Sequence, residues 1–153
     1  MRRSLVLIAA LAVGCIASPP RAEASGLGCN VSTTPLVFGS YAPLSGAQLT
    51  ASGAASVNCL ILGGTVQIAL SSGGGSFTPR TMLGPGGAKL KYNLYTSAAY
   101  TTIWGDGTSG TATVALVVPL LAPASATIYG LVPGAQDVPV GSYSSTVTAT
   151  ITF

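Results

Sequence analysis

The sequence predicts an all-β protein built as an antiparallel β-sandwich. The clearest observation is the terminal stretch, where apolar residues alternate with threonines; the apolar set is Val147, Ala149, Ile151 and Phe153. A period of two places these side chains on one face of a strand and the hydroxyls on the other. Similar short stretches recur along the chain, separated by turns that use many of its 20 glycines and 10 prolines. No segment shows a sustained helical period, so strands joined by turns are expected throughout.

Residues 1–24 are predicted to be a secretory signal peptide. Two arginines follow Met1, an apolar stretch spans 4–16, and Ala22-Glu23-Ala24 forms an A-x-A cleavage site. The apolar stretch is too short to cross a bilayer, so export through the periplasm without a transmembrane anchor is expected. Lipidation at Cys15 is an alternative, but the usual leucine three residues before the cysteine is absent.

Residues 25–153 are expected to form one domain with a substantial core. This part of the chain carries very little charge, net +1, from Arg80, Lys89, Lys91, Asp106 and Asp137. The charges are scattered and form no basic patch with interleaved aromatic residues, which argues against binding to nucleic acid.

Two cysteines remain after removal of the signal peptide, Cys29 and Cys59. An even pair in an exported protein indicates a disulfide. A metal site is the alternative, but the sequence has no histidine and no second cysteine pair to complete it.

The elements are expected in the following order along the chain. Strands are predicted at 29–33, 54–62, 65–71, 89–95, 111–118, 126–132 and 141–153, with an extended run at 36–43, a connection or minor strand at 48–52 and a strand end followed by a turn at 103–107. Leu90, Tyr92 and Leu94 should face inward. The glycine-rich stretch 72–76 lacks the lysine of a phosphate-binding loop and is predicted to be a hairpin loop.

The residue types needed for catalysis are scarce. Without histidine, Ser-His-Asp and Cys-His catalysis are excluded, and a glycosidase would need both Asp106 and Asp137 in one cleft. A turn aspartate is the expected role for Asp106. We therefore expect a protein that is not an enzyme and has no metal or cofactor. Arg80 is interpreted either as an exposed solubilising charge or, preferably, as a clamp on backbone carbonyls.

The mature chain resembles the spore coat protein U domain family, which includes subunits of archaic chaperone–usher pili. The resemblance covers 29–153 and depends on the order and spacing of several short motifs. They are Cys29-Asn30-Val31, 36–41, 53–59, Arg80-Thr81-Met82, 90–95, Trp104-Gly105-Asp106-Gly107, Ile128-Tyr129-Gly130 and Gly141-Ser142-Tyr143. The family's Gly-x-Tyr segment is often followed by an Asp-Thr pair, and here Ser145 stands at the Asp position.

The resemblance implies an incomplete immunoglobulin-like sandwich that lacks its last strand. A periplasmic chaperone first fills the groove, and a neighbouring subunit's N-terminal strand then replaces it. The terminal strand favours the same interpretation, because a strand edge that no later strand covers can pair with another chain. An interior strand that happens to come last is the alternative. Val147, Ala149, Ile151 and Phe153 are therefore the expected strand-acceptor edge.

These expectations lead to a surface subunit of a chaperone–usher pilus or coat, with a role in adhesion or biofilm. Its partners would be a chaperone, an outer-membrane usher and other subunits. After cleavage, only 25–28 precede Cys29, and 18–24 contain two prolines and two charges, so no donor strand is evident. The subunit should accept a strand without donating one, as at a tip or cap. The alternatives are a self-sufficient spore or cell-surface coat protein, a carbohydrate-binding module using Trp104 and Tyr100, and a small hydrolase.

Overall fold

The computed structural model describes residues 4–13, 24–26, 28–60 and 63–153. In this part of the chain there is no α-helix, and all pairings between the named strands are antiparallel. The strands are β1 (Ser4–Val13), β2 (Ala24–Gly26), β3 (Cys29–Thr34), β4 (Leu49–Cys59), β5 (Gly64–Leu70), β6 (Arg80–Leu83), β7 (Lys89–Tyr95), β8 (Val114–Val118), β9 (Pro123–Val132) and β10 (Tyr143–Thr152). Two 3₁₀ turns, η1 (Pro43–Ser45) and η2 (Pro85–Gly87), lie between them.

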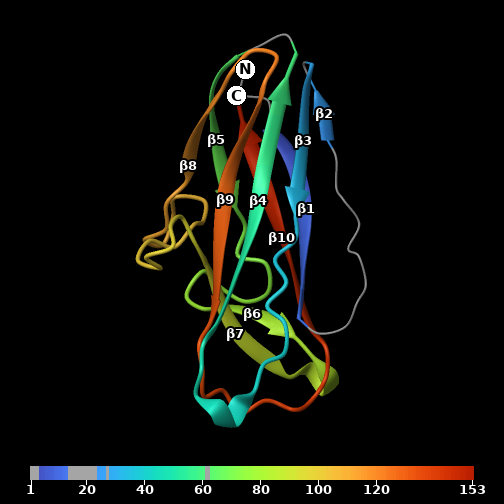
Figure 1. Cartoon of the computed structure of the whole chain (residues 1–153), viewed down its shortest axis with the longest axis vertical. Helices are drawn as coiled ribbons and strands as arrows, with labels where there is room; N and C mark the ends of the chain where they lie inside the picture. The colour runs from blue at the N-terminus through green and yellow to red at the C-terminus, as the bar shows by residue number, and fades with distance from the viewer. Residues whose placement is uncertain (1–3, 14–23, 27, 61–62) are drawn as a thin grey trace.

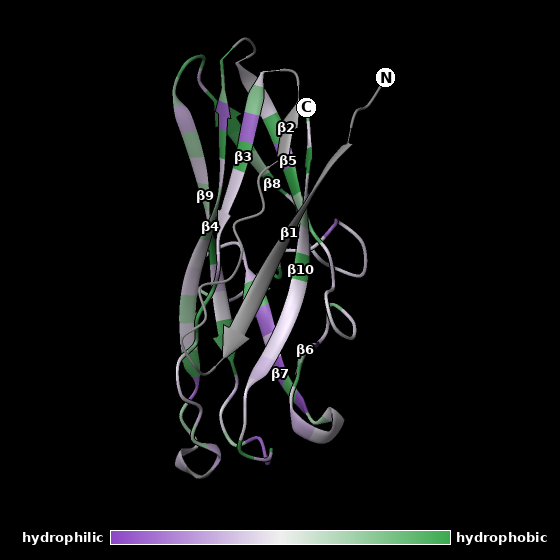
Figure 2. Cartoon of the chain, turned by 90° about the vertical axis from the view of Figure 1, so that its right-hand side faces the viewer, coloured by the Kyte–Doolittle hydropathy of each residue, from purple (hydrophilic) through white to green (hydrophobic). Residues whose placement is uncertain are grey.

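The strands form the two layers of an elongated sandwich (Figures 1 and 2). One layer has the order β2-β3-β4-β9-β7, and the other contains β8, β5, β10 and β1. The layers are joined at the lower end by β7, which pairs with β6 through 89–92 and with β9 through 93–95. Because β6 in turn meets β10 at Ser144, the two layers form one continuous sheet. The predicted all-β antiparallel sandwich is confirmed.

The core lies between the layers and follows the alternation of the sequence. Leu90, Tyr92 and Leu94 of β7 are all buried, as predicted. In β10 buried and more accessible residues alternate along the whole strand. This is the result expected when one face of each strand packs against the opposite layer and the other faces solvent.

The structure corrects several sequence-based expectations. The minor strand at 48–52 and the strand at 54–62 are one continuous strand, β4, which ends at Cys59. The strand β6 was not predicted. At 103–107 the prediction is close to the structure, because Ile103 and Trp104 make isolated bridges and a bend follows at 105–107. The stretch 72–76 is not a hairpin loop: it follows β5 and leads to β6, and these two strands pair with β10 instead of with each other.

Arg80, the first residue of β6, explains why this short strand is held in place. Its side chain is fully buried, and it donates to the carbonyl oxygens of Ser71 (2.9 Å) and Trp104 (2.7 Å) and to Oδ1 of Asn93 (2.7 Å). Its guanidinium also lies over the ring of Phe77, at 5.2 Å. The preferred interpretation of Arg80 as a clamp on backbone carbonyls is therefore correct. Burial lowers the pKa of Arg80 to about 10, which leaves it charged at neutral pH.

Candidate strand-acceptor site

The terminal strand β10 is the centre of the candidate site. Of the four apolar residues predicted to form the acceptor edge, Val147, Ala149 and Ile151 are buried and face the core. Phe153 lies beyond the end of β10 and is 41% exposed, so it is not part of this buried face. The site therefore consists of these three buried side chains and of the two backbone edges of β10, which can pair with neighbouring strands.

One edge of β10 is satisfied by residues of the same domain. Its upper half pairs with β5, from Ala149 opposite Leu70 to Thr152 opposite Gln67. Just below this pairing, Ser71 in the loop after β5 hydrogen-bonds to the same edge of β10. The amide of Ser71 donates to the carbonyl of Thr148, and the amide of Thr148 donates to Oγ of Ser71, both at 2.9 Å. This edge therefore needs no further strand.

The other edge of β10 is paired along its whole length with β1. The register runs from Ser4 opposite Thr152 to Val13 opposite Tyr143, which is every residue of both strands. β1 also contacts β3 and β2 of the facing layer, so it bridges the two layers beside β10 (Figure 1). The residues that cover this edge belong to the predicted signal peptide. Its predicted cleavage site includes Ala22 and Glu23, which lie outside the described residues, and Cys15 lies outside them as well.

A small apolar cavity of about 10 Å³ marks the gap between β3 and β10. Thr33 and Thr34 line it from β3, and Val147 and Ala149 line it from β10. These two strands belong to different layers and do not pair with each other. A strand inserted between them would cover the apolar residues of β10 that line the cavity, and β1 lies there, paired with β10 and in contact with β3.

Ser145 takes up the hydrogen-bonding position for which the resemblance implies an aspartate. Its Oγ accepts a hydrogen bond from the hydroxyl of Tyr92 (3.0 Å) and another from the amide of Gly74 (3.3 Å). Burial raises the pKa of Tyr92, so its hydroxyl keeps the proton that it donates. Ser145 therefore accepts a hydrogen bond from the 72–76 loop, and this bond holds the loop against the edge of β10 that pairs with β5.

The disulfide between Cys29 and Cys59 lies at the upper end of the molecule. The two cysteines are directly opposite each other in the β3–β4 ladder, and both are buried. The predicted pairing is confirmed. It ties β3, which borders the gap beside β10, to the central strands of its layer.

Removing this disulfide by the double substitution Cys29→Ala and Cys59→Ala should destabilise the fold by roughly 3–4 kcal/mol, because the bond closes a loop of about 30 residues. Chemical unfolding measures the loss. Intact mass after alkylation, with and without reductant, checks the bond itself. Two free thiols in protein exported under oxidising conditions would contradict the assignment.

The remaining polar residues have structural roles. Oδ1 of Asp106 accepts hydrogen bonds from the amide (2.9 Å) and the hydroxyl (2.6 Å) of Thr108, which lower the pKa of its carboxyl group and make it the expected turn aspartate. Trp104 is fully buried, and its indole donates to the carbonyl of Ile68. It is therefore unavailable to stack on a sugar, and the carbohydrate-binding alternative loses one of its two candidate residues.

The described residues contain no group of three or more His, Cys, Asp or Glu side chains placed to hold a metal ion. In the same part of the chain, no helix has the length and apolar character needed to cross a membrane.

Sequence reasoning missed two parts of the site. It identified the apolar stretch 4–16 by composition alone, and nothing in that stretch indicates that residues 4–13 pair with β10. It also did not predict that the segments 39–43 and 138–143 come together around a cavity at the lower end of β10. Several glycines and prolines interrupt the alternation in these segments, and no local pattern indicates that they meet.

Comparisons with known proteins agree with this architecture. A chain in the crystal structure of a chaperone–tip adhesion subunit pre-assembly complex, from the archaic chaperone–usher Csu pili of Acinetobacter baumannii, is similar in fold, with a TM-score of 0.50 and 18% identity. The match covers 69% of this chain, which spans only 35% of that one. Protein U of Myxococcus xanthus is 36% identical over 143 residues, which cover 85% of this chain and 78% of Protein U. The Spore Coat Protein U domain model matches residues 21–150. The chain therefore belongs to the Spore Coat Protein U domain family.

Proposed function

We propose that this chain is an exported structural or adhesive subunit of a chaperone–usher pilus or a surface coat, completed by a strand from another subunit. The observation that carries the proposal is the outer edge of β10, which is fully paired by residues 4–13. The sequence predicts that these residues are removed on export. Their loss would leave ten residues of backbone and an apolar gap without a partner, and a donor strand is the occupant that fits both.

A subunit in this state would need a chaperone in the periplasm, because an uncovered apolar gap promotes aggregation. An outer-membrane usher and other subunits would follow as partners on the route to the cell surface. The fold likeness to the Acinetobacter baumannii complex, which contains a chaperone and a tip adhesion subunit, supports this proposal.

The chain is further proposed to accept a strand without donating one. Residues 24–26 form β2, which folds back on β3 with Ala24 opposite Val31 and Gly26 opposite Cys29. A segment held in this way inside its own domain is not free to reach a neighbour. This arrangement supports a position at the tip or cap of an assembly.

The test uses the exported protein in complex with a periplasmic chaperone. Synthetic N-terminal peptides from partner subunits should enter the protein and displace the chaperone, and a peptide of its own residues 25–34 should complement no subunit. A variant lacking Ile151–Phe153 should fail to capture the chaperone, because the upper end of β10 is lost. Homopolymer fibres formed by this protein alone would refute the acceptor-only role.

A further inference from the structure

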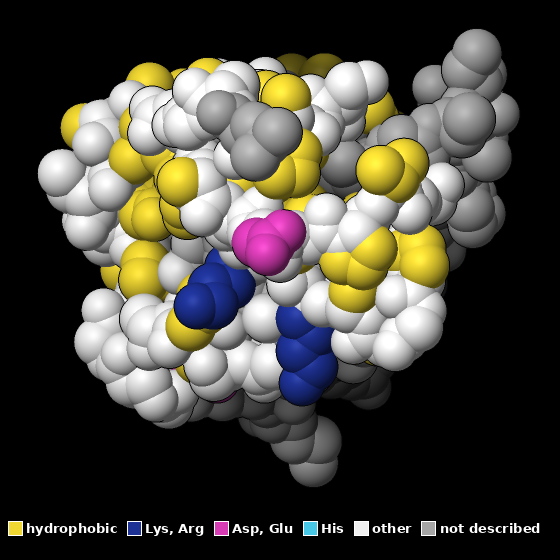
Figure 3. Space-filling model, turned by 90° about the horizontal axis from the view of Figure 1, so that it is seen from below, with side chains coloured by type: hydrophobic (Ala, Val, Ile, Leu, Met, Phe, Trp, Pro, Cys, Tyr) yellow, Lys and Arg dark blue, Asp and Glu magenta, His cyan; other side chains and the backbone are white. Residues whose placement is uncertain are grey.

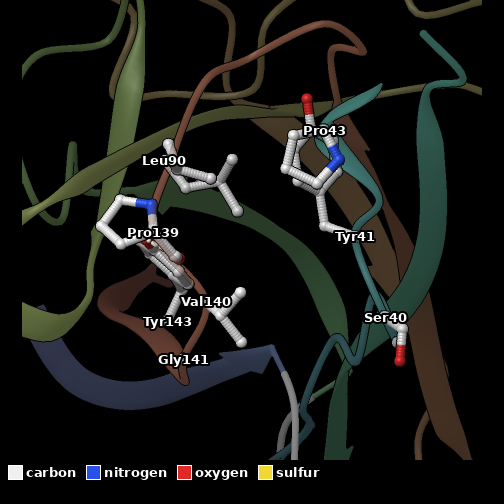
Figure 4. Close-up of a pocket in the computed structure, with 10 residues that line it drawn as sticks. Ser40, Tyr41, Pro43, Leu90, Pro139, Val140, Gly141 and Tyr143 are labelled. Carbon is white, nitrogen blue, oxygen red and sulfur yellow. Dashed lines mark hydrogen bonds between the residues drawn. The ribbon is translucent and has the colours of Figure 1, made fainter. Parts of the chain in front are cut away.

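The six tyrosines of the chain fall into two groups according to what their hydroxyls bind. The hydroxyls of Tyr41 and Tyr143, which line the cavity at the lower end (Figure 4), donate to backbone carbonyls, and that of Tyr92 donates to Ser145. The other three hydroxyls make no hydrogen bond within the part of the chain that the structure describes; they belong to Tyr95, Tyr100 and Tyr129. A phenol without a partner in its own fold remains able to bind one outside it.

Tyr95, Tyr100 and Tyr129, here called the tyrosine cluster, lie together on the outer face of one layer. Tyr95 of β7 and Tyr129 of β9 are directly opposite each other in the antiparallel ladder. Their neighbours Leu94 and Gly130 are buried, so the alternation of the strands turns both tyrosines outward. The ring of Tyr100 meets that of Tyr95 edge to face, with centroids 5.5 Å apart and planes at 89°. All three side chains are only partly buried, and the face that they share is turned toward the viewer in Figure 1.

Tyr100 is held against Tyr95 by a closed loop. Residues 96–102 form this loop, whose two ends hydrogen-bond to each other through backbone atoms. Within it the amide of Tyr100 donates to the carbonyl of Ser97 (3.1 Å), and the backbone of Tyr100 has a φ of 53°. This left-handed conformation is rare for an aromatic residue and suits glycine or asparagine better. The backbone of the loop therefore gives no reason for tyrosine at this position, whereas a role for its partly exposed ring does.

Strands β4 and β9 present hydroxyl groups and no charge beside the tyrosine cluster. Ser52 of β4 is opposite Tyr129, and Thr127 lies two residues before Tyr129 on the same face of β9; both are exposed. Neither β4 nor β9 contains a charged residue. Basic and acidic side chains are visible instead at the lower end of the molecule (Figure 3). A ligand of the cluster is therefore expected to be neutral and rich in hydroxyl groups.

We propose that the tyrosine cluster, together with Ser52 and Thr127, binds a neutral sugar ring of a glycan. A sugar ring has C–H groups that pack on an aromatic face, and its hydroxyls can pair with those of Tyr, Ser and Thr. Because the rings of Tyr95 and Tyr100 are perpendicular, they form a corner that fits a single sugar ring better than a flat polymer chain.

Other ligand classes fit this surface less well. Nucleic acids and acidic polysaccharides need basic side chains, and the adjacent strands β4 and β9 supply none. The inference goes beyond the proposed function and needs no donor strand. The two proposals can therefore fail separately.

The test measures the binding of five tetrasaccharides to the exported protein, produced from the full-length gene and used with any chaperone that it retains. Four are neutral, built from galactose, glucose, mannose or N-acetylglucosamine, and the fifth is the acidic tetragalacturonate. At least one neutral tetrasaccharide should bind with a Kd of about 1 mM or tighter in isothermal titration calorimetry. Tetragalacturonate should bind at least about tenfold more weakly than that one, because burying a carboxylate without a basic partner costs free energy.

Tyr100→Asn separates binding from folding, since asparagine tolerates the left-handed backbone but has no aromatic ring. It should weaken binding of the best tetrasaccharide at least about tenfold. The thermal midpoint, followed through the fluorescence of the single tryptophan Trp104, should shift by no more than about 3 °C.

Two substitutions of Tyr129 separate its ring from its hydroxyl. Tyr129→Ser should weaken binding at least about tenfold, whereas Tyr129→Phe keeps the ring and should weaken it only about threefold. The matched control is Val117→Asn, because Val117 is exposed on β8 of the other layer. It should change the affinity by no more than about twofold.

Several results would overturn the inference and leave the proposed function intact. One is that no neutral tetrasaccharide binds, or that tetragalacturonate binds best. Another is that Tyr100→Asn or Tyr129→Ser binds within about twofold of the natural protein, or that Val117→Asn weakens binding as much as they do. A loss of binding in both tyrosine variants that accompanies a fall of more than about 3 °C in the thermal midpoint also overturns it, because the rings would then serve folding.

Discussion

Replacing Arg80 with methionine should lower the free energy of unfolding by about 4 kcal/mol or more. Methionine is of similar length and apolar, so the core remains filled. What is lost is the group that donates to the carbonyls of Ser71 and Trp104 and to Oδ1 of Asn93. Buried acceptors left without a donor cost about 1–3 kcal/mol each.

Because of the position of Arg80, losing its hydrogen bonds should weaken contacts in several other elements. Ser71 also bonds with Thr148 of β10, and Asn93 donates to the carbonyl of Phe77 in the loop before β6. The single tryptophan, Trp104, is one of the acceptors, so its fluorescence reports on the same region during urea unfolding. The expected result is a large shift of the unfolding midpoint with a little-changed slope.

Two further variants separate the clamp from the charge. Lys89→Met makes a comparable change at an exposed position and should alter stability by no more than about 0.5 kcal/mol. Arg80→Lys keeps the charge but cannot reach three acceptors in different directions, so it should recover only part of the stability. If Arg80→Met unfolds within about 1 kcal/mol of the natural protein, the clamp is not an important source of stability.

The parts of the fold that could be predicted are those that depend on local pattern. β10 and β7 alternate strictly, and Cys29 and Cys59 form an even pair in a chain that looks exported. The strand β6 could not be predicted in this way. It has four residues, two of them polar, and its place depends on contacts that Arg80 makes with residues 9 to 24 positions away.

The candidate site was predictable only in part, for a related reason. The alternation in β10 identifies its buried face, but which strand lies beside each edge depends on tertiary pairing. The run 4–13 has no alternation of its own to indicate a sheet partner. The cavity beside Tyr143 is formed by two segments about 100 residues apart, and no local pattern reveals that they meet.

The largest expected effect concerns the strand that covers β10. Residues 25–153 expressed alone should aggregate or be degraded, because one edge of β10 and the apolar gap beside it are uncovered. Restoring the strand at the other end of the chain should rescue the fold. Ser4 is opposite Thr152, so a short turn after Phe153 can lead into the sequence of residues 4–13 in the observed antiparallel register.

The rescued variant joins Phe153 to Asn-Gly and then to Ser4–Val13. It should be a soluble monomer that unfolds cooperatively, measured by gel filtration and by thermal denaturation followed through Trp104. The matched control carries the same tail with Leu7→Pro and Ala9→Pro, which removes backbone donors from the added strand and should abolish the rescue. If residues 25–153 alone are soluble, monomeric and cooperative at high temperature, the sandwich is already complete without the added strand. The protein would then be a self-sufficient coat domain, because a closed β10 edge leaves no place for a donor strand.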